Sequence, residues 1–312
     1  MHNASPDRLM RIAVSGTTGL VGSALCDRLS GQGREVRRIV RAATGSGRDI
    51  DWDTEGHRFN AAALSQCDAV VHLAGESIMG RWTDPKKTRV RDSRVASTRA
   101  LASTLANLEG GPRTLIVASA IGYYGDTGQT DARTEDDPAG NTETDFLADV
   151  CVQWEAAADP ARQAGIRVVH VRIGIVLSPD GGALATMLLP FKLGLGGVVG
   201  RGDQWMSWIA LTDLIRIIEH AIDTPEISGP INAVAPEPAT NRQFTKALGG
   251  VLRRPTVLPV PGFAPKLLYG RECANALVLG SIRVVPRRLL DAGFIFELPD
   301  LDKALRHELG RA

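Results

Sequence analysis

The sequence predicts an α/β fold: a doubly wound parallel sheet of the Rossmann type with a smaller C-terminal α/β substrate lobe. Three observations lead to this prediction. Strand-like runs alternate with helical patterns, a glycine-rich turn joins the first strand to the first helix, and several strand-like runs, such as 69–74 and 114–118, are almost wholly apolar. Alternation of this kind is typical of doubly wound folds, and nearly continuous hydrophobic runs are typical of parallel strands covered on both faces.

The first strand, expected near 10–15, leads through a glycine turn into a helix expected near 20–31. A first glycine permits the tight turn, a second lets the backbone approach a phosphate, and a third lets the helix lie close to the strand. Free N–H groups at the start of the helix then face an anion. The alternative is a purely structural turn. The residues expected to bind a dinucleotide pyrophosphate are Gly16, Thr17, Thr18, Gly19, Leu20, Val21 and Gly22.

Arg41 follows the second expected strand, 35–40, and indicates which dinucleotide binds. In NAD-binding proteins an acidic residue near this point accepts a hydrogen bond from the ribose 2′-hydroxyl, and here no Asp or Glu occurs before Asp49. A guanidinium group suits a 2′-phosphate instead. We therefore expect NADP(H) as the cofactor. The alternative is that Arg41 simply ends the strand in solvent.

The remaining elements continue the alternation and then change in character. Further strands are expected near 48–52, 68–74, 113–119 and 166–173, and helices near 60–66, 84–109, 142–164 and 212–223. After about residue 176, glycines cluster at 194–202 and prolines spread over 225–265, with helical patterns near 240–253, 263–279 and 300–309. We expect an NADP-binding domain over 1–175, to which 205–235 returns, and a substrate lobe over 176–312.

Composition excludes several classes of function. A net charge of +1 over 312 residues gives no general attraction to nucleic acid or acidic membranes. The four cysteines form no CxxC pair and the six histidines show no metal-ligand spacing, so we expect no metal. Residues 1–8 are polar and no apolar stretch reaches the length of a membrane span, which predicts a cytoplasmic protein without a signal peptide.

Motifs spread along the chain resemble those of the extended short-chain dehydrogenases, the nucleotide-sugar epimerase/dehydratase group. The shared features are the GxxGxxG spacing of the turn and the segments 71–75, 119–125 and 154–155. More specific segments are similar to an atypical, epimerase-like subfamily that has a distinctive C-terminal domain of unknown role, and some of its members are labelled cell-division inhibitors. These segments are 75–78, 81–82, 93–94, 146–148, 194–197, 204–209, 232–233, 286–289 and 293–294.

The resemblance implies an NADP(H) site and a small-molecule substrate, without a particular reaction. Beyond the turn and Arg41, the implied cofactor-binding residues are Leu73, Ala74, Gly75, Ser119, Ile173 and Gly174. The substrate-side candidates are Glu76, Arg201, Gln204 and Trp205. Glu76 has the alternative role of capping the next helix, and the segment around Arg201 and Trp205 has the alternative of being a surface loop. In a basic run that is otherwise expected to face solvent, Arg94 lies on the helix face that points toward the cofactor in related folds.

The acid/base pair of ordinary members of this group is missing. They use a Tyr-xxx-Lys pair and a Ser or Thr, and the lysine lowers the tyrosine pKa so that the phenolate can accept a proton. Here the lysine position falls on Cys151, the tyrosine position on Leu147, and the Ser/Thr position near Ala120. The remaining candidates for catalysis are Ser119, Tyr123 and Tyr124, together with Glu76.

Two functional interpretations remain open. In the first, the protein is an NADP(H)-dependent oxidoreductase or epimerase-like enzyme with a different acid/base, and it acts on a small hydroxylated or carbonyl compound, for which a nucleotide sugar is one candidate. In the second, it is a catalytically silent NADP(H) sensor or scaffold that acts through a protein partner. The resemblance also implies a homodimer formed through the helices near 84–109 and 142–164.

Overall fold

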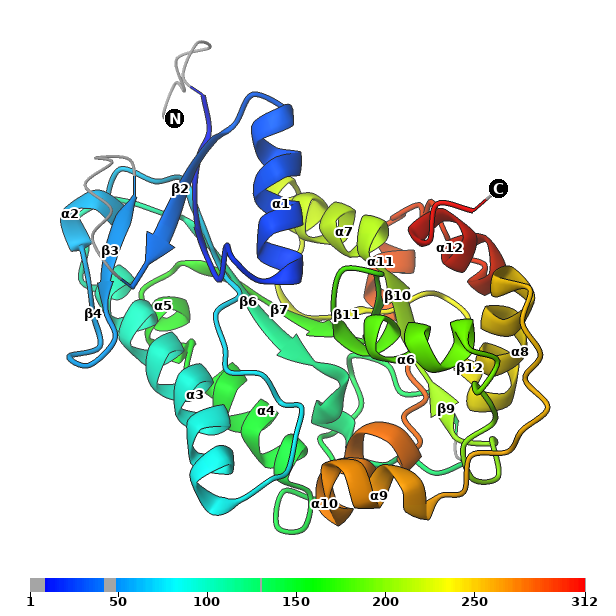
Figure 1. Cartoon of the computed structure of the whole chain (residues 1–312). Coiled ribbons are helices and arrows are strands. Elements are labelled where there is room, and N and C mark those ends of the chain that lie inside the picture. Colours follow the sequence, from blue (N-terminus) through cyan, green and yellow to red (C-terminus); the bar gives the residue numbers. More distant parts are fainter. Residues whose placement is uncertain (1–8, 42–48, 130, 312) are drawn as a thin grey trace.

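The computed structural model describes residues 9–41, 49–129 and 131–311, and its centre is a large, mostly parallel sheet (Figure 1). Its strand order is β11-β7-β6-β5-β1-β2-β3-β4, and among these eight strands β4 runs antiparallel to its neighbour. The strand order reverses between β1 and β5, which is where doubly wound sheets bind ligands. The strands are β1 (Arg11–Ser15), β2 (Glu35–Val40), β3 (Ile50–Asp53), β4 (Arg58–Phe59), β5 (Ala69–His72), β6 (Thr114–Ala120), β7 (Arg167–Ile173) and β11 (Gly229–Ala233).

Two helical layers cover the sheet, which confirms the predicted doubly wound fold (Figure 1). Successive side chains of a strand point to opposite faces, so Ile12 and Val14 of β1 join one core cluster while Ala13 joins the other. The first cluster lies under α1 (Leu20–Gly31) and α7 (Leu211–Asp223). The second lies under α3 (Asp84–Ala106), α4 (Phe146–Ala156) and α5 (Asp159–Gln163), and a short α2 (Ala61–Leu64) adjoins it.

Two long helices expected from the sequence are broken in the structure. The helix expected over 142–164 begins only after Asp145, which caps α4, and a second helix follows with Pro160 in its first turn. Proline suits a first turn because it has no N–H to lose there. The helix expected over 263–279 is divided at Gly270, whose φ of 83° is left-handed, into α9 (Phe263–Tyr269), α10 (Arg271–Ala274) and a π-helical turn, Asn275–Leu279.

The second half of the chain adds short elements, several of which the sequence pattern did not reveal. Gly174 lies between β7 and the next strand, and a Cβ there would lie 2.6 Å from the carbonyl oxygen of Ser207. A separate apolar cluster forms around Trp208 and Phe244. The elements are β8 (Ile175–Leu177), α6 (Gly182–Lys192), β9 (Trp205–Met206), β10 (Trp208–Ala210), β12 (Ala239–Thr240), α8 (Asn241–Leu252), α11 (Arg287–Asp291) and α12 (Leu301–Glu308).

Strands from the second half of the chain extend the large sheet and form small sheets of their own. β11 pairs in parallel with β7, at one edge of the large sheet, whereas β10 pairs with β8 and β12 with β9. The division of the chain into two domains stays a prediction. No helix in the described ranges is long and apolar enough to cross a membrane. The polar segment 1–8, on which the absence of a signal peptide was predicted, lies outside the described residues.

A C-terminal segment, 281–285, ties the two halves together. Ile282 donates its N–H to the carbonyl oxygen of Trp205 at 3.1 Å, and Arg133 donates to the carbonyl of Arg283 at 2.8 Å. Ser207 Oγ donates to the carbonyl oxygen of Ile282 at 2.9 Å. The segment therefore lies between the chain that follows β6 and the strand β9, beside the carboxyl end of the large sheet.

Candidate functional site

The glycine turn lies at the carboxyl end of β1, where the strand order reverses. Gly16 has a left-handed φ of 71°, and a Cβ on it would lie 2.8 Å from the carbonyl carbon of Leu73 and 2.9 Å from the nitrogen of Ala74. A Cβ on Gly22 would collide with the carbonyl oxygen of Gly16. Gly19 caps α1 without a side chain. The turn therefore presents backbone and a helix N-terminus, which is a suitable site for an anion such as a pyrophosphate.

A buried polar chain fixes the neighbouring end of β5. Ser15 Oγ accepts the N–H groups of Leu73 at 3.1 Å and Ala74 at 3.3 Å, and it lies 2.8 Å from Nδ1 of His72. The serine proton therefore goes to Nδ1, so Nε2 carries the ring proton and donates to Ser97 Oγ at 3.1 Å. Burial lowers the pKa of His72 to about 4, so the ring is neutral.

This polar chain places the backbone of Leu73 and Ala74 against the glycine turn, and the role of these two residues in cofactor binding stays a prediction. No role was expected for His72 itself. The available signal was a histidine at the end of an otherwise apolar strand, which in the fold has to find partners because a buried polar group is costly without hydrogen bonds.

Arg41 directly follows β2 and is exposed, with no ion pair to the residues that the structure describes. The nearest acidic residue along the chain, Asp49, is engaged elsewhere: Arg38 donates Nε to Oδ1 at 3.0 Å and Nη2 to Oδ2 at 2.9 Å. The carboxylate that could accept a ribose 2′-hydroxyl is therefore paired with a guanidinium, and a second guanidinium stands at the end of the strand.

A buried ionic network occupies the carboxyl ends of β6 and β7. Arg172 binds Glu155 through two parallel hydrogen bonds, from Nε to Oε1 at 2.8 Å and from Nη2 to Oε2 at 2.9 Å. Ser119 Oγ donates to the same Oε1 at 2.8 Å. Arg172 Nη1 donates to the hydroxyl of Tyr124 at 2.8 Å, and that hydroxyl donates to Oδ1 of Asn232 at 2.8 Å. The network joins α4, β6, β7 and β11.

The electrostatics of this network favour stable ionisation and a protonated phenol. Burial disfavours the charge of Arg172, but the hydrogen bonds and charge of Glu155 outweigh it and raise the pKa of the guanidinium above its usual value. Burial raises the pKa of Tyr124 to about 12, although Arg172 and Asn232 oppose the shift. Tyr124 therefore keeps its proton, and Ser119 directs its proton to a carboxylate. Neither hydroxyl is placed to accept a proton from a substrate at neutral pH.

Tyr123 differs from its neighbour. Its ring lies over Arg172, with the guanidinium carbon 3.5 Å from the ring centroid, and its side chain is only half-buried. Its hydroxyl makes no hydrogen bond to the described residues. Among the three predicted catalytic side chains, Tyr123 alone has a hydroxyl that is not already committed within this network.

The residue at the usual lysine position is neutral. Burial raises the pKa of the Cys151 thiol to about 12, and its sulfur accepts a backbone hydrogen bond from Ala120. Ile173 ends β7, and the N–H of Gly174 donates to the carbonyl of Ala233 at 3.1 Å. Gly174 thus has a packing reason for its small size, independent of any cofactor.

The four predicted substrate residues do not form one cluster of free polar groups. Glu76 accepts a hydrogen bond from Lys86 Nζ at 2.7 Å, which holds the pKa of that carboxyl below its usual value. Gln204 is buried and donates its amide N–H groups to the carbonyls of Val199 and Val278, and its place on the substrate side stays a prediction. Arg201 is exposed and pairs with Asp203 at 3.1 Å.

Trp205 is half-buried and covered on one face. The guanidinium carbon of Arg283 lies 4.3 Å from its ring centroid. Arg283 comes from the segment 281–285, and a contact between this segment and the loop of Trp205 was not expected from the sequence. No sequence pattern within either segment predicts a contact between residues so far apart in the chain.

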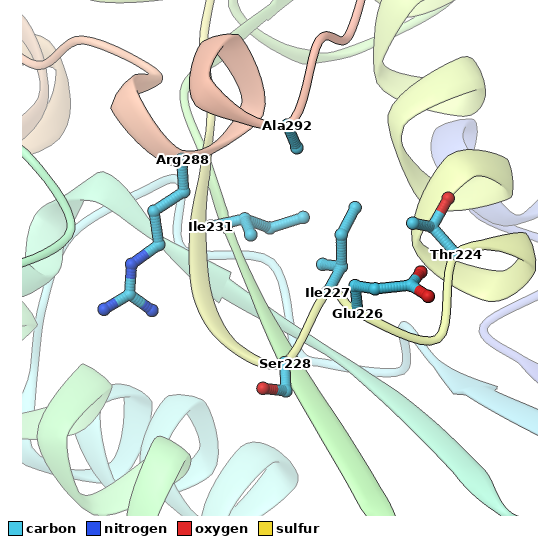
Figure 2. A pocket seen from close by; sticks show the side chains of 7 residues that line it. All are labelled: Thr224, Glu226, Ile227, Ser228, Ile231, Arg288 and Ala292. Carbon is cyan, nitrogen blue, oxygen red and sulfur yellow. The ribbon is translucent and has the colours of Figure 1, made fainter.

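A cavity of about 350 Å³ lies elsewhere, near the amino end of β11 (Figure 2). Figure 2 shows Arg288 on one side of it and Glu226 and Thr224 on the other. Arg288 donates hydrogen bonds to the carbonyl oxygen of Pro230 and to Oδ1 of Asp136. This cavity contains none of the residues predicted for the functional site. Among the described residues, no group of three His, Cys, Asp or Glu side chains is arranged to hold a metal ion.

Comparison with known proteins agrees with this architecture. Residues 12–233 match the NAD dependent epimerase/dehydratase family, and residues 260–308 match a domain of unknown function, DUF1731. Epimerase family protein Mb2239 of Mycobacterium bovis is 42% identical over 301 residues, which cover 96% of this chain and 98% of that protein. Epimerase family protein SDR39U1 of Homo sapiens is 38% identical over 304 residues, covering 95% and 99%.

Solved structures show the same fold. The crystal structure of human epimerase family protein SDR39U1 (isoform 2) with NADPH is 35% identical, covers 97% of this chain and 100% of that chain, and has a TM-score of 0.87. A Thermus thermophilus UDP-glucose 4-epimerase complex with NAD is 17% identical with a TM-score of 0.73, covers 97% of this chain and 100% of that chain, and supports the fold alone. With its glycine turn, reversed strand order and C-terminal segment, this chain belongs to the NAD dependent epimerase/dehydratase family.

Proposed function

We propose that the protein is an NADP(H)-binding oxidoreductase or epimerase-like enzyme that acts on a small hydroxylated or carbonyl substrate. The observation that carries this proposal is the combination of a backbone cradle at Gly16 and Gly22 with an exposed guanidinium, Arg41, at the end of β2. The family match and the NADPH in the human SDR39U1 structure support the same cofactor.

The residues present fit that cofactor. The turn and the start of α1 would hold the pyrophosphate, Arg41 the 2′-phosphate, and the backbone of Leu73 and Ala74 the opposite wall of the crevice. When bound, the nicotinamide would donate or accept a hydride. Tyr123 would exchange the accompanying proton with the substrate oxygen, because its hydroxyl is not committed to a hydrogen bond with the described residues.

A second function is favoured by one specific observation. The side chains of the ionic network are hydrogen-bonded to one another, and Tyr124 keeps its proton; they are Ser119, Glu155, Arg172 and Tyr124. A site with an intact cofactor cradle and a fully paired network is also what a catalytically silent NADP(H) sensor, acting through a protein partner, would have. Hydride exchange distinguishes the two functions, since a sensor binds NADP(H) without exchange.

The test of cofactor identity is titration of the purified chain with NADPH and with NADH. We expect tighter binding of NADPH, and we expect Arg41→Asp to weaken it by about 10- to 100-fold, as loss of a charged hydrogen-bond partner does, without affecting NADH. Arg99→Asp, an exposed arginine of α3, is the control for the change in net charge. Failure of both nucleotides to bind at millimolar concentration would contradict the proposal.

The test of catalysis follows hydride transfer between bound, isotope-labelled NADPH and a panel of carbonyl compounds. An enzyme transfers the label to a compound, and Tyr123→Phe slows the transfer while Tyr124→Phe leaves most of it. Tight NADPH binding with no transfer to any compound supports the sensor.

A further inference from the structure

Arg94 lies near the carboxyl ends of β5 and β6. No carboxylate among the described residues forms an ion pair with it. Arg94, in α3, donates Nη1 to the carbonyl oxygen of Val90 at 3.0 Å, within its own helix. Its guanidinium carbon lies 5.1 Å from the ring centroid of Trp154. It also packs on Gly75: a Cβ at that glycine would lie 3.2 Å from the guanidinium carbon. The side chain is half-buried, so part of the group remains reachable.

The acidic side chains around Arg94 are bound to other cations. Glu76, which follows Gly75, is held by Lys86 at 2.7 Å and approached by Arg89 at 3.9 Å, so it acts on Arg94 only at longer range. Glu155 is held by Arg172 at 2.8 Å. The acidic side chains at this edge are therefore paired with other cations and form no ion pair with Arg94.

The neighbouring titratable groups add no negative charge. The Cys151 thiol, which interacts electrostatically with Arg94, is protonated because burial raises its pKa, and His72 is neutral because burial lowers its pKa. The pair of Arg172 and Glu155 has no net charge. Arg94 thus leaves an excess of one positive charge between β5 and α4, and burial lowers its pKa because this charge is only partly solvated.

We propose that Arg94 binds an anionic group of the substrate, a carboxylate or a phosphate, beside Gly75 at the carboxyl end of β5. A partly buried guanidinium is stabilised by an anion, and its planar arrangement of N–H donors matches two oxygens of either group. Gly75 is exposed and has no side chain, so a ligand can approach the guanidinium across it. The inference rests on the proposed function, and it narrows the substrate to acidic compounds.

The position also gives Arg94 a place in the chemistry of the site. Ordinary extended short-chain dehydrogenases have a lysine at the position of Cys151. In this chain the cation near that position is Arg94, which comes from α3 instead of α4. Ser93, the preceding residue, accepts the N–H of Glu76 at 2.9 Å, so the loop that carries Gly75 is tied to the same turn of α3 as the guanidinium.

Calorimetric titration of the full chain with acetate and with inorganic phosphate tests the proposal, first saturated with NADPH and then without it. We expect one of the two anions to bind, which also tells a carboxylate site from a phosphate site. Arg94→Gln should raise the dissociation constant of that anion about tenfold or more, as expected for loss of a charge-assisted hydrogen bond. Arg99→Gln, from an exposed position of the same helix, should leave it unchanged.

Several results would overturn the proposal. In the first, neither anion binds the wild-type chain. In the second, the Arg94→Gln variant binds the anion as tightly as the wild type. In the third, the same variant loses NADPH binding but still binds the anion. If Arg94→Gln does not fold, Arg94→Lys replaces it: charge is kept without the planar donors, so anion binding should weaken severalfold while NADPH binding is retained. Because each variant is also titrated with NADPH alone, failure of cofactor binding is seen separately from failure of the anion site.

Discussion

The two ends of the site, the glycine turn between β1 and β5 and the ionic network between β6 and β7, are built by opposite means. At the turn, the contacts are between backbone atoms, and Gly16 and Gly22 are required because a Cβ would collide with neighbouring backbone. At the network, the contacts are between charged and polar side chains, and Arg172 is 3% exposed. The turn is accessible, and steric exclusion between backbone atoms sets its shape. The network is buried, and ion pairs and hydrogen bonds hold it together.

The difference shows which part of the site is ready for a ligand. The turn leaves a helix N-terminus without a side-chain cap, so its hydrogen-bonding capacity is available to an anion. The network uses its capacity internally, because a buried charge without a partner would be costly. We therefore expect ligand binding at the first end and rigidity at the second. Tyr123, at the second end, and Arg94, beside Gly75 at the carboxyl end of β5, are the side chains that we propose for contact with a substrate.

The sharpest way to break the comparison is Gly22→Ala. The added methyl group collides with the carbonyl oxygen of Gly16, so the turn must move, and we expect no detectable NADPH binding by titration. Gly31→Ala, at the other end of the same helix, is the matched control, because a Cβ there meets nothing within 4 Å. Normal NADPH binding by Gly22→Ala would mean that the turn is not the cofactor cradle.

Arg172→Met should cost the most stability. It leaves Glu155 buried without its partner, and breaking a buried ion pair in this way costs about 3–5 kcal/mol. The free energy of unfolding from urea titration measures the change. Arg162→Met removes an exposed pair with Asp159 and should cost about 0–1 kcal/mol. Equal effects of the two substitutions would show that the network is not a rigid support.

His72 should make the wall of the cradle sensitive to acid. Its pKa is lowered from 6.5 to about 4 in the fold, so the unfolded chain binds the proton more readily between these values. The contribution is complete above pH 6.5, is lost as the pH falls to 4, and amounts to about 3 kcal/mol. Unfolding of the wild type and of His72→Gln, compared at pH 7 and pH 4.5, isolates it. An equal acid loss in both proteins would contradict this role.

The smallest effects should separate the two adjacent tyrosines. Tyr124→Phe removes a buried hydroxyl that binds Asn232 and Arg172, at a cost of about 1–3 kcal/mol. Tyr123→Phe should change stability by less than about 0.5 kcal/mol, since its hydroxyl has no described partner. Thermal unfolding checks both variants, and the reverse order of effects would show that Tyr123, not Tyr124, belongs to the network.

Local sequence was enough for six of the eight strands of the large sheet and for the position of the glycine turn, but not for β4 and β11. Strands such as β2 and β7 lie where their hydrophobic patterns predicted them, and the glycine turn follows β1 as expected. The helical pattern expected over 263–279 is interrupted at Gly270, because the pattern did not reveal the left-handed backbone of that residue. Two-residue strands such as β9 and β12 escaped prediction because they are defined by their pairing and carry no periodicity of their own.

By itself, the sequence determined the fold class, the glycine turn, the cation at Arg41 and the absence of a Tyr-xxx-Lys pair, because each depends on residues close together in the chain. Only the tertiary structure decided that Tyr124 is a paired, protonated phenol, that Gln204 donates to two backbone carbonyls, and that Arg94 faces Gly75 without an ion pair to any described carboxylate. These roles depend on hydrogen bonds, burial and charges between residues far apart in the sequence. Such interactions exist only after the strands have been brought side by side.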